Sequence, residues 1–181
     1  GLTMFLVDMK TPGITAEPMD PLSSHNICTT FFDNVRVPKS ALVGELNKGW
    51  KHITGQLNHE RVTICSPGML GSVYDEVLEW SRETKHTNGR RVIDQEWVQM
   101  NLARVRAGLE FVRLLNWKVA WTGTHGKLNV ADASAIKVYG TEFYMESFRH
   151  LMEIIGPRAY LTRDSRGNAV HGYLESLYRS L

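Results

Sequence analysis

The hydrophobic pattern of this chain changes near Lys48. Before that point apolar residues recur with a period of about two, and after it with a period of about 3.6. We therefore expect two regions: residues 1–46, the end of a β-domain, and residues 47–181, a helical bundle. A few strands do not form a stable sheet alone, so the first region is expected to borrow strands from a partner or to belong to a longer protein.

The first region contains short extended runs separated by turn signals. Leu2–Met9 is rich in strand formers and is followed by the turn signal Thr11-Pro12-Gly13. Ile27–Phe32 predicts a second strand, and Asp33-Asn34 offers a turn before a third at residues 35–37. No helix is expected here.

The second region predicts long helices joined by short loops. The first begins near Lys48 and is interrupted by Pro67-Gly68, because proline removes a hydrogen-bond donor. After a loop at Thr87-Asn88-Gly89, Asp94 is the expected N-cap of the next helix, which residues 122–126 should break. Its apolar stripe consists of Val98, Leu102, Val105, Leu109, Val112, Leu115 and Val119.

A third long helix is expected after Asn129, which with Asp132 resembles a capping box. Gly156-Pro157 should end it, and a final helical stretch covers Leu174–Leu181. Its inward face should be Ala133, Ile136, Gly140, Phe143, Ser147, Leu151 and Ile154. The predicted fold is mostly α: an up-and-down four-helix bundle preceded by the last strands of a β-barrel-like domain.

Composition excludes several classes of protein. Lys plus Arg number 21 against 19 acidic residues, so the basic excess of a nucleic-acid-binding protein is missing. No apolar stretch is long enough to span a membrane. The two cysteines lie far apart and the seven histidines follow no ligand spacing, so no metal site is expected.

Few residues indicate chemistry by themselves. Asn58-His59-Glu60-Arg61 places a carboxylate beside a guanidinium in an otherwise apolar helix. This is either a surface ion-pair cluster or a buried base tuned by a neighbouring cation. The basic loop Asn88-Gly89-Arg90-Arg91 is a solvated turn unless a phosphate ligand exists. We expect core or interface anchors at Trp50, Trp80, Trp97, Trp117 and Trp121.

Several motifs, in order, resemble the acyl-CoA dehydrogenase family. The most specific is Phe-Asp-Asn-Val-Arg-Val-Pro at residues 32–38, followed by Gly-Glu and Gly-Trp. The resemblance covers the whole chain and implies that the family's N-terminal helical domain, most of its β-domain and a C-terminal segment lie outside it. The matching segments are residues 5–8, 11–13, 32–38, 42–45, 48–50, 57–61, 135–137, 154–157 and 177–179.

The resemblance implies a flavin-dependent dehydrogenase that desaturates an acyl-CoA thioester. In such enzymes a carboxylate removes the α-proton while a β-hydride passes to FAD. One branch of the family carries the base beyond the end of this chain, and the branch with the long-chain and isovaleryl enzymes carries it before an arginine of the first bundle helix. Glu60 before Arg61 matches the second branch. Asn58 matches the contact to the pantetheine arm, and Lys127 is a candidate for the CoA phosphate.

The family's flavin-contacting loop is only partly matched. Arg82, Lys85 and Gln95 are the expected cofactor-binding residues, although the usual phenylalanine is missing. Where the family has a glutamine and a second glycine near the neighbouring subunit's flavin, this chain has Glu153 and Pro157. A carboxylate is unfavourable beside a diphosphate, and proline has no N–H to offer it. This pattern suits a heteromeric enzyme of the actinobacterial steroid type.

Two alternatives to a catalytic subunit remain: a non-catalytic scaffold of a heteromeric dehydrogenase, and a flavin monooxygenase of the same fold. Glu60 argues against the scaffold, which needs no carboxylate there. The implied partners are an acyl-CoA, like or unlike subunits in a dimer or tetramer formed through the bundle, and an acceptor such as an electron-transfer flavoprotein. The expected location is the bacterial cytoplasm.

Overall fold

The computed structural model describes residues 1–23, 26–126 and 129–181, and the side chains of Asn58, His59 and Val62 lie outside that description. The chain divides into two compact units, Gly1–Glu60 and Arg61–Leu181. The boundary falls within helix α1 (Gly49–Ile64), and each unit is described by itself.

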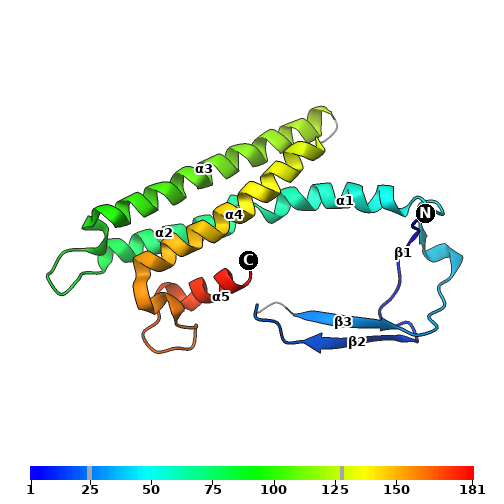
Figure 1. The fold of residues 1–181 in the computed structure, drawn as a ribbon, viewed down its shortest axis with the longest axis horizontal. Coiled ribbons are helices and arrows are strands. Elements are labelled where there is room, and N and C mark those ends of the chain that lie inside the picture. The colour runs from blue at the N-terminus through cyan, green and yellow to red at the C-terminus, as the bar shows by residue number, and fades with distance from the viewer. Residues whose placement is uncertain (24–25, 127–128) are drawn as a thin grey trace. The chain divides into compact units, whose positions relative to one another are not determined.

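The first unit contains two small antiparallel sheets, each made of two strands (Figure 1). In the first, Met4 lies opposite Val43 and Phe5 opposite Leu42. In the second, the register runs from Ile14 opposite Phe32 to Met19 opposite Ile27. A 3-10 turn, η1 (Lys39–Ala41), precedes the last strand. The strands are β1 (Met4–Phe5), β2 (Ile14–Met19), β3 (Ile27–Phe32) and β4 (Leu42–Val43).

The strand predictions are confirmed only in part. Ile27–Phe32 is a strand as predicted, whereas the run from Leu2 to Met9 is a strand only at Met4–Phe5. The strand predicted at residues 35–37 is wrong: it follows Asn34, whose φ is 49°, and it joins no ladder. Strand β2 was missed because Glu17 and Pro18 interrupt its apolar pattern, although proline is tolerated on an edge strand.

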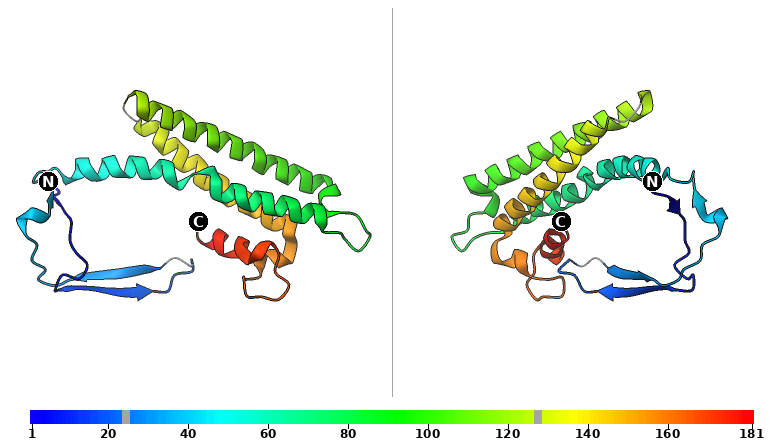
Figure 2. Two further views of the ribbon diagram at one scale, coloured as in Figure 1. Left: turned by 180° about the vertical axis from the view of Figure 1, so that it is seen from behind. Right: turned by 45° about the vertical axis from the view of Figure 1, so that its right-hand side comes forward.

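The second unit is a helical bundle, which confirms the predicted fold class. Its long helices α2, α3 and α4 pack along one another, and α5 packs against α4 (Figures 1 and 2). Three 3-10 turns join them: η2 (Val92–Asp94), η3 (Gly156–Tyr160) and η4 (Val170–Gly172). The helices are α2 (Pro67–Glu83), α3 (Glu96–His125), α4 (Val130–Ile155) and α5 (Tyr173–Arg179).

Local chemistry explains where these helices begin and end. Pro67 is the first residue of α2, where a missing N–H costs nothing, so the predicted interruption separates α1 from α2. Asn129 caps α4 as predicted, because its side chain accepts a hydrogen bond from the Ala131 amide. Gly156 ends α4 with a φ of 70°, a conformation that glycine adopts without strain.

Two predicted boundaries of α3 are wrong. Asp94 is not the N-cap: it lies in η2, where its carboxylate is bound by Arg91, and Gln95 occupies the cap position. The helix also continues through Gly123 to His125. Threonine hydroxyls of the last turns bond to carbonyls of their own helix, which keeps that segment helical despite its turn-like composition.

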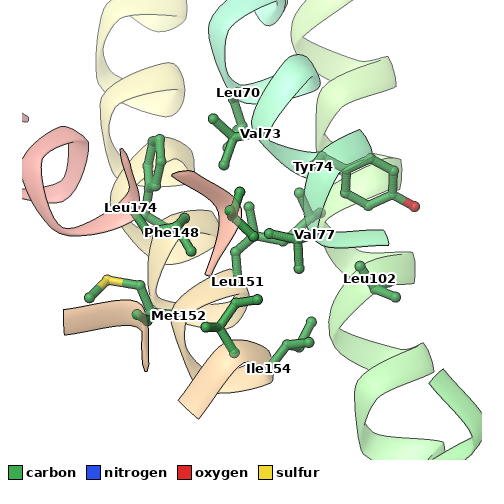
Figure 3. Packing of buried hydrophobic residues seen from close by; sticks show 14 of the residues in the cluster. Leu70, Val73, Tyr74, Val77, Leu102, Phe148, Leu151, Met152, Ile154 and Leu174 are labelled. Carbon is green, nitrogen blue, oxygen red and sulfur yellow. The ribbon is translucent and has the colours of Figure 1, made fainter. Parts of the chain in front are cut away.

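The hydrophobic core lies among α2, α3, α4 and α5 (Figure 3). Both predicted stripes are buried: six of the seven α3 residues, all except the half-buried Leu115, and all seven α4 residues. Most of them belong to this core, while Val119 and Ile136 pack with Cys65 in a second, smaller cluster. In Figure 3, Leu70, Val73 and Val77 of α2 meet Phe148 and Leu151 of α4. The bundle is therefore organised by its 3.6-residue periodicity.

The tryptophans are not core anchors. Trp50, Trp97, Trp117 and Trp121 have exposed fractions of 42% or more, and Trp80 is half-buried against the core. The core is filled by aliphatic residues, methionine, phenylalanine and tyrosine instead. A role of these tryptophans at an interface stays a prediction.

Candidate functional site

The fourth turn of α1 carries the proposed base. Glu60 and Arg61 follow one another on this helix, and the exposed Glu60 and the half-buried Arg61 both have interaction partners. Consecutive residues of an α-helix point about 100° apart, so the two side chains leave the helix in different directions. The helix places Asn58 two residues earlier, but its side chain is outside the described part of the chain, as is the whole of Lys127.

Arg61 is held by helix α4. Its guanidinium Nη1 donates a hydrogen bond to the hydroxyl oxygen of Ser134 at 3.4 Å. The contact joins residues 73 positions apart. Ser134 lies between the buried residues Ala133 and Ile136, so α4 brings a hydroxyl to the turn that follows Glu60.

The break between α1 and α2 is stabilised by side chains of the other two long helices. The carbonyl of Cys65 accepts a hydrogen bond from Asn116 Nδ2 of α3 at 2.9 Å, and the carbonyl of Ser66 accepts one from the Tyr144 hydroxyl of α4. Gly140 lies so close that a Cβ there would come within 2.5 Å of the Cys65 Cβ. These side chains satisfy carbonyls that a helix end leaves unpaired. We call this group, Asn116, Gly140 and Tyr144, the break clamp.

Burial governs the acid–base properties of the residues at the break. Desolvation raises the pKa of the Cys65 thiol, and the nearby Lys137 partly offsets that effect. Desolvation also raises the pKa of Tyr144 to about 12, with a smaller contribution from Cys65. Both groups are therefore neutral at physiological pH, and neither is an activated nucleophile or base.

Of the three predicted cofactor-binding residues, Arg82 lies in the last turn of α2, and Lys85 and Gln95 lie in the loop between α2 and α3; each makes different contacts. Arg82 pairs with Glu79 on its own helix at 3.4 Å, and Lys85 forms a β-bridge with Arg91. Gln95 contacts His86 at 2.5 Å through its side-chain amide. The hydrogen bonds from Arg91 lower the pKa of Asp94 and tie the loop together.

Gln95 lies beside the end of α4. A pocket of about 480 Å³ is formed by the loop, Trp97 and the segment Glu153–Arg158. It brings Gln95 together with Glu153 and Pro157, whereas Arg82 and Lys85 are not among the described residues of its lining. The Glu153 carboxylate accepts a hydrogen bond of 3.0 Å from the buried Asn101.

This pocket does not fit a flavin diphosphate. The carboxyl group of Glu153 lies on the pocket lining, where Asn101 donates a hydrogen bond to it, and a carboxylate is unfavourable beside phosphate oxygens. Pro157 provides no N–H donor. Gln95 and the guanidinium of Arg158 are the donor groups suited to a nucleotide, and they lie on the same lining as Glu153.

Sequence reasoning missed several of these residues. Ser134, Asn116 and Tyr144 give no local signal, because their partners are between 51 and 78 positions away. Gly140 was expected on the inward face of its helix, and its close approach to Cys65 confirms this placement. No cluster of three or more metal-ligating side chains occurs in the described residues. The same described residues contain no helix with both the length and the apolar character to cross a bilayer.

Comparison with known sequences identifies one family. The family described as acyl-CoA dehydrogenase, C-terminal domain, matches residues 47–180. The acyl-CoA dehydrogenase FadE26 of Mycobacterium tuberculosis is 41% identical over 183 residues, which cover 99% of this chain and 46% of that protein. FadE29 of the same organism is 40% identical over 86% of this chain and 40% of its own length.

Solved structures give the same result. A chain of the ChsE4-ChsE5 complex from Mycobacterium tuberculosis has a TM-score of 0.89 at 42% identity, over 98% of this chain and 46% of that one. The Tcur3481-Tcur3483 steroid ACAD has a TM-score of 0.89 at 36% identity, over 99% of this chain and 45% of that one. The chain therefore spans about half the length of the relatives that it matches.

Proposed function

Because this chain belongs to the acyl-CoA dehydrogenase family, we propose that it takes part in the α,β-desaturation of an acyl-CoA thioester. Glu60 is the base that removes the α-proton. The observation that carries this assignment is the Glu60-Arg61 pair on α1, with Arg61 fastened to Ser134 in the turn where the resemblance expects the base. The role of α1 is to hold an ionised carboxylate within reach of the substrate's α-carbon.

The bound flavin supplies the acceptor for the β-hydride. In this proposal Asn58 contacts the pantetheine arm and Lys127 the CoA phosphate, as the resemblance implies. Of the expected cofactor-binding residues, Gln95 lines the pocket at the end of α4, which is unsuited to a diphosphate, and Arg82 and Lys85 would have to act from outside that lining.

We propose that an unlike partner subunit completes the enzyme. The pocket with Glu153 and Pro157 is unsuited to the diphosphate of a neighbouring flavin. A homomer made only of this subunit would repeat that defect at every interface. ChsE4-ChsE5 is a complex of two differently named components, and Tcur3481-Tcur3483, which also carries two component names, is a steroid ACAD. Their likeness supports an unlike partner and a bulky, steroid-type acyl-CoA.

The outward face of α3 supports assembly through the bundle. This face exposes six large apolar side chains, and an exposed apolar surface of this kind is typical of a protein–protein interface. We propose that it packs against another subunit of a dimer or tetramer. The exposed large apolar residues of α3 are Trp97, Met100, Phe111, Leu114, Trp117 and Trp121.

An electron-transfer flavoprotein as acceptor and a location in the bacterial cytoplasm complete the proposal. The mycobacterial relatives support the bacterial assignment. No described contact favours the scaffold or monooxygenase alternatives, so they enter only as outcomes of the test.

The test uses the whole protein, coexpressed with its partner subunit and loaded with flavin. Bleaching of the flavin absorbance is followed after mixing with a panel of acyl-CoAs. We expect Glu60→Gln to bind the ligand but to bleach at least about 10²-fold more slowly than wild type. Glu142→Gln, at an exposed position of α4, is the matched control and should bleach normally.

The alternatives predict different results. If Glu60→Gln bleaches as fast as wild type, the base lies elsewhere. If no flavin is retained with or without the partner, the chain is a scaffold. Consumption of oxygen by free reduced flavin, without any response to acyl-CoA, would identify a monooxygenase.

A further inference from the structure

Helix α4 contacts the end of α1 and the start of α2 in a continuous series. Ser134 contacts Arg61, the Lys137 carbonyl accepts a weak hydrogen bond from the Cys65 thiol at 3.8 Å, and Tyr144 bonds to the Ser66 carbonyl. These α4 residues recur at helical spacing on one face. Their partners follow in the same order along the chain, so this face of α4 aligns the segment 61–66.

The contacts at the break are more numerous than a simple change of direction requires. Proline at position 67 already ends one helix and starts the next. Yet the two carbonyls before it are bonded by side chains from two different helices, and Asn116 also bonds to the Val112 carbonyl of its own helix at 2.9 Å. Both bonds are donated by the same amide nitrogen, Nδ2 of Asn116, which ties the Cys65 carbonyl to α3 and restrains the break.

Arg61 is the second fixed point, one turn before the break. The long side chain of Arg61 loses rotamer freedom when it bonds to Ser134, so this contact with α4 restricts the last turn of α1. Since successive side chains diverge by about 100°, the direction of Arg61 also sets the direction in which the preceding residue, Glu60, leaves the helix. Arg61 need not touch the carboxylate to determine where it points.

We propose that Arg61 and Ser134 form a pin, framed by the break clamp, which orients the turn of α1 that carries the base. This inference rests on the proposed function of Glu60. Ser134 is then a positioning residue rather than a catalytic one. Small displacements of a base reduce the rate of proton abstraction without changing how the substrate binds elsewhere.

The experiment compares Ser134→Ala with Ser134→Thr in the flavin-loaded whole protein with its partner. The rate of flavin bleaching at saturating acyl-CoA, the dissociation constant of the acyl-CoA and the isotope effect of an α-deuterated substrate are measured. We expect Ser134→Ala to bleach on the order of tenfold more slowly, with a larger α-deuterium effect and an unchanged dissociation constant. Ser134→Thr keeps the hydroxyl and should restore the rate.

Two controls separate this inference from its alternatives. Ser72→Ala removes a hydroxyl that donates a hydrogen bond to the Gly68 carbonyl of its own helix at 3.3 Å, and this variant should leave the rate unchanged. Glu60→Gln is measured in parallel. An inactive Glu60→Gln with a normal Ser134→Ala overturns the pin and leaves the proposed base intact, whereas an active Glu60→Gln overturns the base itself.

A purely structural role for Ser134 has a separate signature. In that case Ser134→Ala would lower the flavin content and the amplitude of bleaching, while the molecules that remain loaded would react at the normal rate and with the normal isotope effect. That result would overturn the inference. Ser134→Cys, which is close in size and a weaker hydrogen-bonding group, provides the rate measurement if the alanine variant does not fold.

Discussion

The two units of this chain differ in how they treat their apolar side chains. In the helical unit, the stripes of α3 and α4 are buried, and Phe148, Leu151 and Leu174 are almost inaccessible to solvent. In the first unit, Ile27, Phe31 and Phe32 of the β2–β3 pair are each at least 45% exposed. The bundle therefore has a hydrophobic core of its own, whereas the apolar side chains of the strands are not buried by other residues of the first unit.

The largest expected effect tests this contrast directly. Phe148→Ala should lower the free energy of unfolding by about 3–5 kcal/mol, because it leaves a cavity in a packed core. Phe32→Ala, at a side chain that is 64% exposed, should cost about 0.5 kcal/mol or less. Denaturant unfolding followed by far-UV circular dichroism measures both. Equal losses would break the comparison and show that the strands are as well covered as the bundle.

A smaller effect tests how tightly the break clamp is packed. Gly140→Ala would place a methyl group within 2.5 Å of the Cys65 Cβ, and we expect it to cost about 1–3 kcal/mol of unfolding free energy. Gly71→Ala is the matched control on α2, since no described atom lies within 4 Å of its added methyl group. It should stabilise the protein by up to about 1 kcal/mol, because alanine favours helix. If both variants changed the unfolding free energy in the same direction, the close packing of Gly140 against Cys65 would be contradicted.

The last prediction concerns how the stability of the helical unit depends on pH. Tyr144 has its pKa raised from 10.0 to about 12 by burial, so folding favours its neutral form. That stability is fully present below pH 10 and is lost as the pH rises towards 12. Wild type should therefore lose about 2 kcal/mol over this range that Tyr144→Phe does not lose, while the variant costs about 1 kcal/mol at neutral pH. The measurement is the unfolding free energy of both proteins between pH 10 and pH 12. If it changes with pH equally in wild type and Tyr144→Phe, the Tyr144 hydroxyl is solvated.

The bundle could be predicted from sequence because helical periodicity is local. Residues such as Ile136, Phe143 and Leu151 specify an inward face through their spacing alone, and the cap at Asn129 depends on its immediate neighbours. Strand pairing is not local. The β2 strand, with Glu17 and Pro18 in it, is recognisable only beside β3, so it was missed.

The candidate site shows the same division. Glu60 and Arg61 were identified because they are adjacent in sequence and match a family motif. Ser134 could not be identified, since a serine in an amphipathic helix carries no sign of a partner 73 residues away. The resemblance assigned Gln95 and Glu153 to separate flavin contacts and did not predict that they are neighbours, whereas the pocket between the loop and α4 brings them together.

The exposed β2–β3 pair has a consequence for how this protein has to be made. The pair presents phenylalanine, isoleucine and methionine side chains to solvent along two six-residue strands. Such segments are templates for unwanted strand pairing and aggregation until they are covered. During synthesis, the contacts that cover this hairpin must form early or a chaperone must shield it. Recombinant preparations of the strands alone should aggregate. The time at which the hairpin becomes covered, rather than the stability of the bundle, should limit the yield of folded protein.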